Sequence, residues 1–150
     1  MRPPDLIIGP AHNPQTLRWH LLRWRGWQLA LHKWLRSDDD RALHDHVSWN
    51  VSIILWGRYR EIFSHKWEMP WQNSKIRRPL IPYFRRAATP HRVELLPGSG
   101  PVWSLWLRGP PRRSWGFYCP KGWKHWRDYV NESDYSAPGS VSSVGPGCDD

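Results

Sequence analysis

The segment from His44 to Gly57 constrains the fold of this chain more than any other part of the sequence. From Val47 onward it is rich in Val, Ile and Trp, which favour β-strands, so we predict one continuous strand over residues 44–56 that ends in a turn at Gly57. Side chains at i and i+2 of a strand lie on the same face, so His44 and His46 would project into one space. Two imidazoles that converge in this way form a chelate for a divalent metal ion.

A third histidine lies in a separate strand-like segment. His91 follows a turn at residues 87–90 and opens a short run of strand formers that ends at Leu95. A single histidine is more often a packing or surface residue than a ligand, so the first pair is informative chiefly because another imidazole accompanies it. We predict that His44, His46 and His91 bind one divalent metal ion.

The spacing around the histidine pair resembles that of the metal-binding cupins. The first motif of that family is Gly-x5-His-x-His-x3-Glu-x6-Gly, and this chain has His44-x-His46-x3-Asn50-x6-Gly57. Every spacing is kept, but Asn50 stands where the acidic ligand of the family lies, and Asp38 occupies the opening glycine position. A charged fourth ligand from position 50 is therefore excluded.

The second cupin motif, Gly-x5-Pro-x-Gly-x2-His-x3-Asn, is matched here at its histidine alone. His91 occupies that position, whereas the other motif positions hold Leu80, Arg86, Ala88 and Leu95. Residues 31–46 and 115–123 are in addition similar to uncharacterised small cupin proteins of bacteria and their phages. The resemblance covers residues 15 to 130 and implies a small single-domain metal-binding cupin.

Both the pattern and the resemblance predict an all-β fold. Short strands separated by turn signals, without alternating helices, indicate an antiparallel sandwich or barrel. The resemblance specifies it as the cupin double-stranded β-helix, or jelly roll, whose inward faces would bring His91 to the other two histidines. We expect residues 1–14 to form an extended lead, residues 15–131 the cupin domain and residues 132–150, rich in Ser, Gly and Pro, a disordered tail.

Other segments give more local predictions. Residues 14–25 form either a short N-terminal helix, with Leu17, Leu21 and Trp24 on one face, or a first strand. Strands are expected over residues 27–35, 102–108 and 114–119, and a return strand at 58–63 is expected to pair in a hairpin about Gly57. Residues 121–130 are expected to form a loop and one helical turn.

The charge and the aromatic content leave two further readings open. Lys and Arg number 22 against 13 Asp and Glu, and the net charge of +9 favours an anionic partner, although a basic soluble surface has the same composition. The 13 tryptophans supply core for a small polar chain. Alternatively, a basic and aromatic cluster could stack on single-stranded nucleic acid, and its members are Trp19, Arg23, Trp24, Arg25 and Trp27.

The cysteines and the apolar runs indicate the compartment. Cys119 and Cys148 do not make a disulfide framework, and since Cys148 falls in the expected tail we predict that they stay unpaired. No apolar run is long enough to span a membrane, and the N-terminal residues lack the apolar core of a signal peptide. The expectation is a soluble cytoplasmic protein without a membrane partner. Whether two copies form a homodimer through an edge strand is left open.

The ligand set predicts the kind of reaction. In cupins of the germin and oxalate-oxidase type, an acidic residue completes a set of three histidines and one glutamate, whereas Asn50 makes this chain more similar to the three-histidine iron site of the thiol dioxygenases. The resemblance to the small cupin proteins brings no reaction with it. By analogy in charge and ligand count we predict a mononuclear non-haem Fe(II) oxygenase acting on a small anionic substrate, with Zn, Ni or Mn as alternative metals. Asn50, Glu61 and Arg92 are predicted to lie behind the metal ligands or to contact the substrate, with Asn50 hydrogen-bonded to a metal-bound water or to the substrate. For Glu61 a structural salt bridge with an arginine is the more common role. An isomerase or lyase, or a basic binding module without catalysis, remain the alternatives.

Overall fold

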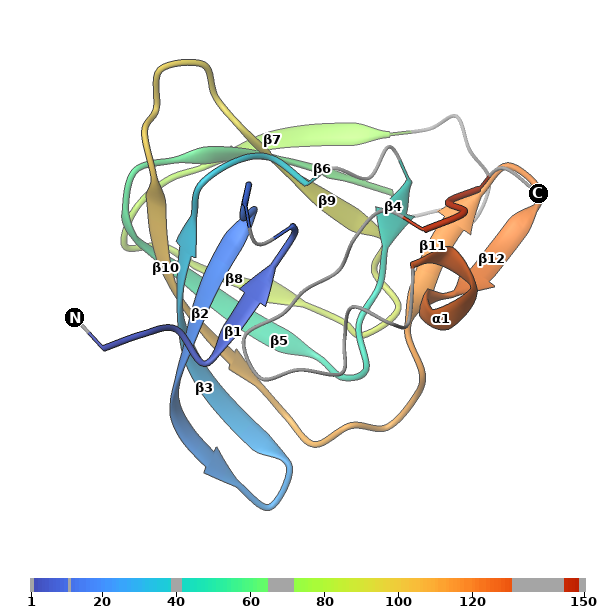
Figure 1. Ribbon diagram of the computed structural model, residues 1–150, viewed down its shortest axis with the longest axis horizontal. Helices are drawn as coiled ribbons and strands as arrows, with labels where there is room; N and C mark the ends of the chain where they lie inside the picture. Colours follow the sequence, from blue (N-terminus) through green and yellow to red (C-terminus); the bar gives the residue numbers. More distant parts are fainter. Residues whose placement is uncertain (1, 11, 39–41, 65–71, 131–144, 149–150) are drawn as a thin grey trace.

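A computed structural model of the chain describes residues 2–10, 12–38, 42–64, 72–130 and 145–148. Within these residues twelve strands form two antiparallel sheets of six strands each, which face one another across a central space (Figure 1). This all-β, jelly-roll architecture confirms the fold class that the sequence predicts. None of the helices among the described residues is long and apolar enough to cross a membrane.

The first sheet, here called sheet A, contains the first three strands of the chain. Its order is β1 (Leu6–Ile8), β2 (Thr16–Trp24), β3 (Trp27–Trp34), β10 (Val102–Arg108), β5 (Asn50–Trp56) and β8 (Pro82–Arg85). The predicted strands over 27–35 and 102–108 are confirmed as β3 and β10.

The second sheet, here called sheet B, carries two of the three histidines. Its order is β12 (Gly122–His125), β11 (Gly116–Cys119), β4 (Leu43–His44), β9 (His91–Leu95), β6 (Tyr59–Phe63) and β7 (Asn73–Arg77). The predicted strand at 114–119 is confirmed as β11, and a single helical turn, α1 (Trp126–Tyr129), follows β12. The loop expected before this helical turn is thus the strand β12 instead.

The buried apolar residues form two separate clusters. One joins Ile54, Tyr59, Val93 and Val102 between the sheets, and the other packs Phe117 onto Tyr129 with ring centroids 3.6 Å apart. Each of these residues is at most 5% exposed. The space between the two clusters is lined by polar as well as aromatic residues and contains the histidines.

The helix considered for residues 14–25 is wrong, and the alternative, a first strand, is confirmed. Thr16–Trp24 forms β2, which pairs with β1 on one side and with β3 on the other. Its side chains alternate with a period of two, so that Arg18 lies opposite His32 while Leu17 and Trp19 take the other face. Pairing with two neighbouring strands satisfies the backbone groups, and this outweighs the weak helical period. Residues 6–8 of the expected extended lead form β1 in the same sheet.

The continuous strand predicted for residues 44–56 is wrong. β4 ends at His44 in sheet B and β5 begins at Asn50 in sheet A, so residues 45–49 carry the chain from one sheet to the other. The backbone N–H of Asp45 donates to Gly116 O at 3.0 Å, and that of His46 donates to Ala87 O at 2.9 Å. These two bonds to different segments bend the chain where a strand would have continued.

The hairpin predicted about Gly57 is also wrong in its pairing. Gly57 does adopt a left-handed conformation, with φ of +81°, and turns the chain at the end of β5. The following strand β6 nevertheless joins sheet B, where it pairs with β9 and β7 instead of β5. A Cβ at position 57 would lie 3.0 Å from Val102 Cγ2, so the turn packs tightly onto β10. The crossing between sheets brings Glu61 to the same side as His91.

The two cysteines form a disulfide, so the prediction that they stay unpaired is wrong. Cys119 at the end of β11 is bonded to Cys148, which lies 29 positions later in the chain, and their Cα–Cα distance is 5.5 Å. Residues 132–144 and 149–150 of the expected disordered tail lie outside the described residues. Gly147, which is described, donates its N–H to Tyr129 O at 3.1 Å. Residues 147 and 148 are therefore fixed beside α1 and β11.

Opening this disulfide is expected to lower the free energy of unfolding by about 3 to 4 kcal/mol. The reason is loop closure, because a cross-link across about 30 residues removes that much chain entropy from the unfolded state. Urea titration of the wild-type protein and of Cys148→Ser, each with and without a reductant, measures the effect. The reductant should shift the unfolding midpoint of the wild type alone. Equal midpoints for the two oxidised proteins would contradict the prediction.

Candidate metal centre

The three predicted histidines converge between the sheets. His44 is the last residue of β4, His46 follows in the crossing segment, and His91 is the first residue of β9. His44 lies directly opposite His91 in the antiparallel register of sheet B. One ring nitrogen from each histidine lies within 4.8 Å of the other two. The structure thus brings together side chains that are 45 residues apart in the sequence.

Asp45 orients the segment that carries two of these histidines. Its carboxylate is fully buried and accepts hydrogen bonds from the backbone N–H of Gly116 at 2.8 Å and from Tyr118 Oη at 3.1 Å. It also accepts from Trp123 Nε1 at 3.2 Å and from Arg113 Nη1 at 2.6 Å. Burial, followed by the neighbouring carboxylate charge, raises the pKa of Tyr118 to about 12. Anchored by four donors, the peptide between His44 and His46 has little freedom to rotate.

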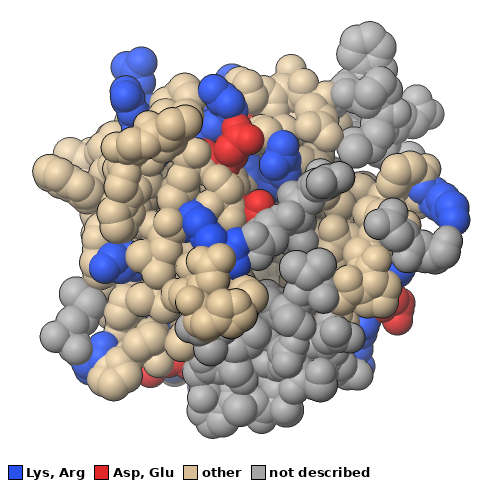
Figure 2. Space-filling view, turned by 45° about the horizontal axis from the view of Figure 1, so that its top comes forward, with Lys and Arg blue, Asp and Glu red and all other residues tan. Residues whose placement is uncertain are grey.

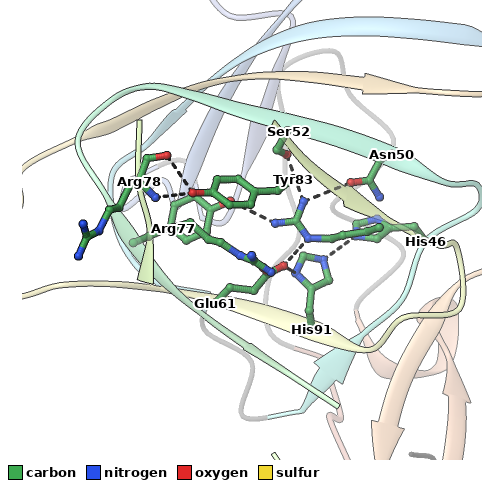
Figure 3. Close-up of polar contacts among 10 residues, drawn as sticks. His46, Asn50, Ser52, Glu61, Arg77, Arg78, Tyr83 and His91 are labelled. Atoms are coloured by element: carbon green, nitrogen blue, oxygen red, sulfur yellow. Dashed lines mark hydrogen bonds and ion pairs between the residues drawn. The ribbon is translucent and has the colours of Figure 1, made fainter. Parts of the chain in front are cut away.

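Glu61 fixes the ring of His91. Glu61 Oε1 lies 3.0 Å from His91 Nδ1, and both side chains are buried (Figure 3). A carboxylate only accepts hydrogen bonds, so this short contact favours a proton on Nδ1 and a lone pair on Nε2, although the Nδ1–H is not directed at the carboxylate as in a hydrogen bond. His91 Nε2 lies 2.7 Å from His46 Nε2. A carboxylate behind a histidine in this way orients the ligands of many metal sites.

Glu61 is in turn neutralised by two arginines. Arg77 and Arg85 both donate from Nε to its carboxylate, one to each oxygen. Arg85 is 5% exposed, and its remaining nitrogens reach Tyr59 Oη at 3.2 Å and Ser52 Oγ at 3.3 Å. Burial alone would raise the pKa of Glu61, but the close contact with His91 and the charge of Arg85 outweigh it and hold the pKa well below its usual range. Glu61 is therefore ionised at neutral pH.

His46 and His91 are neutral at physiological pH. Burial lowers the pKa of His91 to about 3; the contact with Glu61 opposes this shift and the charge of Arg85 adds to it. Burial, with the neighbouring imidazoles as a further cause, also lowers the pKa of His46 well below its usual value. A neutral imidazole offers a lone pair to a metal ion without first losing a proton. The protonation and the positions of these rings thus fit a divalent metal bound by three histidines.

A cavity of about 350 Å³ adjoins the three histidines. It lies between the inner faces of both sheets, and a volume of this size accommodates a small molecule beside a metal. Trp115 and Phe117 stand beside His44, with ring centroids 6.4 Å and 6.1 Å from its ring. Besides the three histidines, the polar part of the wall consists of Gln15, Thr16, Arg18, Gln28, His32, Asp38, Asp45, Asn50, Ser52, Tyr59, Arg85 and Arg108.

Of the other predicted site residues, Asn50 lines the cavity, Glu61 lies behind His91, and Arg92 points away from the cavity. Asn50 is 1% exposed and lines the cavity; its Oδ1 lies 3.4 Å from Arg85 Nη1, and its Nδ2 has no hydrogen-bond partner among the described residues. Glu61 contacts His91 from behind, away from the side that faces His46. Arg92 follows His91 along β9, so strand alternation turns its side chain to the opposite face, away from the cavity.

Sequence reasoning missed Asp45 and Arg85. Alternation along the expected strand would have placed Asp45 on the face opposite to the histidines, and the sequence contains no sign that four donors from distant segments meet there. Arg85 lies in β8, one strand away from β5, and contacts Glu61 only because β6 crosses to the other sheet. Glu61, a carboxylate within a run of strand-forming residues, is the feature of the sequence from which a buried cationic partner could have been predicted.

The basic and aromatic cluster considered for nucleic-acid binding is divided by the fold. Trp19 is 5% exposed and stacks on Trp103, with ring centroids 5.7 Å apart. Trp24 and Arg25 instead lie at the tip of the β2–β3 hairpin, which extends beyond the rest of the sheets (Figure 1). There Arg25 lies over the Trp24 ring, 5.1 Å from its centroid. The cluster is thus partly core and partly an exposed hairpin tip.

Comparisons with known proteins identify the fold. No protein family and no curated protein matches the chain in sequence. Among solved structures, an Fe(II)-HppE with the alternative substrate (S)-1-HPP has a TM-score of 0.57 and 14% identity, over 71% of this chain and 55% of that one. Hydroxypropylphosphonic acid epoxidase from S. wedmorenis has a TM-score of 0.55 and 15% identity, over 73% of this chain and 58% of that one. This chain therefore spans little more than half the length of either protein.

A third similar structure is matched over nearly its whole length. A putative mannose-6-phosphate isomerase from Ralstonia eutropha JMP134 has a TM-score of 0.55 and 15% identity, over 71% of this chain and 92% of that one. These similarities, together with the two facing sheets, show that the chain has the fold of the cupin superfamily. The fold that the His44-x-His46 motif predicts is thereby confirmed. At sequence identities of 13–15%, these similarities establish the fold of the chain but not any reaction that it catalyses.

Proposed function

We propose that this protein is a mononuclear metal-dependent oxygenase that holds Fe(II) with His44, His46 and His91 and acts on a small anionic substrate. One observation carries the proposal: three buried or half-buried imidazoles, held in place by Asp45 and Glu61, converge within 4.8 Å beside a cavity between the sheets. A structural zinc site is normally closed by a fourth protein ligand, whereas three histidines beside a cavity leave room for a substrate.

Different residues of the chain would bind the metal, bind the substrate and exclude water. A redox-active divalent ion bound by the histidines would mediate the transfer of electrons from the bound substrate, which is oxidised, to O2. Asn50 Nδ2 is a buried donor that lines the same cavity, so it would donate a hydrogen bond to a substrate oxygen. Trp115 and Phe117 would exclude bulk water from the side of His44. The ionised Glu61 favours the proton on His91 Nδ1 throughout.

The expected preference for an anion follows from charge. Neutral histidine ligands contribute no charge, and the negative charge of Glu61 is paired with the positive charges of Arg77 and Arg85. The chain as a whole carries a net charge of +9. A divalent ion in such a site keeps its positive charge and attracts an anionic ligand. The similar structure of Fe(II)-HppE holds Fe(II) in the same fold, which is compatible with this choice of metal. A carboxylate or phosphonate that also reaches the metal is the kind of substrate that we propose.

Oxygen uptake tests the proposed reaction. The reduced protein, loaded with Fe(II), is expected to consume O2 at least about ten times faster with one of a panel of amino acids, thiols, oxo acids and phosphonates than without it, since a bound anion completes the site. His91→Ala, treated with the same iron, is the control for free-iron chemistry. Equal uptake by the two proteins on every compound would exclude the oxygenase. Turnover of a sugar phosphate or oxo acid without O2 would then favour an isomerase or lyase.

Nucleic-acid binding receives less support than a small anion. On the face that Figure 2 presents, Lys and Arg form separate groups among uncharged residues instead of a continuous basic stripe. Trp24 and Trp27 are 59% and 37% exposed on the hairpin, where they could stack on bases. Binding of a single-stranded oligonucleotide that weakens steeply with salt and is lost in Trp24→Ala would support this alternative.

The exchange of Asn50 for glutamate is expected to tighten Mn(II) binding about tenfold or more. The added carboxylate would line the same cavity as the histidines and supply the charged oxygen ligand that hard metals prefer. Asn50→Gln, which has the length of glutamate without its charge, is the matched control and should leave the Mn(II) affinity nearly unchanged. Titration of metal-free protein with Mn(II) and Zn(II) measures both. If Asn50→Glu binds Mn(II) no more tightly than Asn50→Gln, the new carboxylate pairs with Arg85 instead.

A further inference from the structure

The central strands of sheet A show an inverted pattern of polar and apolar residues. Their inward positions include the buried polar residues Gln28, His32, Asn50 and Ser52, which line the cavity, and the buried Ser104. Their outward positions are apolar and only partly buried, and these are Leu29, Leu31, Val51, Ile53, Leu105 and Leu107. An antiparallel sheet with one face in water normally places polar residues on that face. We call the six outward residues the apolar face.

The residues of the apolar face are contiguous. The strand registers place Leu107 between Leu29 and Val51, and Leu105 between Leu31 and Ile53, so two adjacent rows cross three strands. The first row continues onto the edge strand β8 through Phe84, which lies opposite Val51 and is 62% exposed. It continues onto β2 through Leu22, which lies opposite Leu29 and is 58% exposed. Five neighbouring strands thus share one apolar surface.

The size of this surface is that of the centre of a protein–protein interface. Five strands spaced about 4.8 Å apart, with rows about 7 Å apart, cover a plane of roughly 20 Å by 15 Å. A standard interface removes about 800 Å² of accessible surface from each partner, with an apolar centre and a polar rim. Exposed side chains near the end of β5 and before β8 enlarge the patch, and these are Leu55, Trp56, Leu80 and Ile81. Apolar patches of this extent often mark sites of protein–protein interaction.

The charges around the apolar face favour a second copy of this chain as the partner. In a chain of net charge +9, two copies repel wherever basic surfaces meet. The outward positions of β3, β5 and β10 contain one cation, Lys33, and its Nζ lies over the Trp103 ring at 5.2 Å from the centroid. An acidic protein or a nucleic acid would find little charge to pair with on this face. Two such faces can meet without like-charge repulsion, as an interface with two-fold symmetry requires.

We propose that the outer face of sheet A is the interface of a homodimer in which two such sheets pack face to face. Sheets packed in this way lie about 10 Å apart with their strands inclined by about 30°. The contact involves the face of the sheet and not an edge strand. It leaves the cavity, on the inner face of the same sheet, accessible in both copies. The proposal is independent of the metal and of the reaction.

Sedimentation velocity on the whole oxidised chain tests the interface. The wild type is expected to sediment at twice 17.9 kDa at micromolar concentration, and raising the salt should not dissociate it, because the contact is apolar. Ile53→Glu, in the middle of the face, should raise the dissociation constant at least about 100-fold, since symmetry buries two unpaired carboxylates. The matched control is Ile76→Glu on β7 of sheet B, where Ile76 is 39% exposed. It should sediment as the wild type does.

The outcomes separate the proposal from its alternatives. A wild type that remains monomeric well above micromolar concentration overturns the proposal. A dimer that Ile53→Glu leaves intact overturns it as well. A dimer that Ile76→Glu dissociates and Ile53→Glu does not would place the interface on sheet B. Circular dichroism and the thermal midpoint of Ile53→Glu establish whether it remains folded. Should that variant unfold, Leu105→Gln gives the same test with a milder change at the centre of the face.

Discussion

His91→Ala is expected to lower the affinity for divalent metal by at least about 100-fold while the two sheets persist. The substitution removes one of three ligand nitrogens and also leaves the carboxylate of Glu61 without the ring that it orients. His46→Ala should reduce the affinity to a similar extent, although it does not touch Glu61. Titration of metal-free protein with Fe(II) under nitrogen, or with Co(II) followed by its absorption bands, measures the affinities.

A matched control separates the metal site from a general effect of losing histidine. His12 is exposed and lies outside the strands, so His12→Ala should keep the affinity of the wild type. Circular dichroism of all the variants in the absence of metal tests that the fold is retained. Should His44→Ala, His46→Ala and His91→Ala each keep the full metal content of the wild type, the three-histidine site is refuted as described. The oxygenase proposal would then fail with it.

The convergence of the histidines was predictable because sequence spacing and fold reinforce each other. The motif positions from His44 to Gly57 indicated a cupin, and in that fold the segments carrying the first pair and His91 must meet. The strand expected to present the pair does not exist as one element, because the chain bends at Asp45. The two rings still converge, with centroids 5.3 Å apart. The geometry therefore comes from the buried Asp45 and not from strand alternation.

The network behind His91 could not be predicted, because it depends on which sheet each strand joins. A hairpin about Gly57 would have left Glu61 beside β5, whereas the crossing into sheet B places it between His91 and Arg85. The partner of Cys119 was missed for a similar reason, since a segment rich in Ser, Gly and Pro gives no periodic signal for its place in the fold. Long-range pairing is set by packing that local pattern does not encode.

Glu61→Gln is expected to lower the free energy of unfolding by about 3 to 5 kcal/mol, the usual cost of breaking a buried ion pair from one side. Glu61 is 1% exposed and Arg85 is 5% exposed, so the amide would leave the guanidinium of Arg85 buried without its counter-charge. The pKa of Glu61 is lowered in the folded protein, so its contribution is complete above the ordinary value of 4.5 and declines as the pH falls below it. Urea titrations of wild type and Glu61→Gln should therefore differ most at neutral pH and converge in acid.

Metal affinity and stability should respond differently when the buried cation is removed as well. Glu61→Gln is expected to weaken metal binding about 10- to 100-fold, because the amide orients His91 Nδ1–H less firmly than the carboxylate does. Adding Arg85→Met removes the uncompensated charge, so the double variant should regain most of the lost stability. It should regain none of the metal affinity, since no carboxylate then faces His91. If affinity returns together with stability, Glu61 acts on the metal site through folding alone, and the role of its contact with the imidazole is disproved.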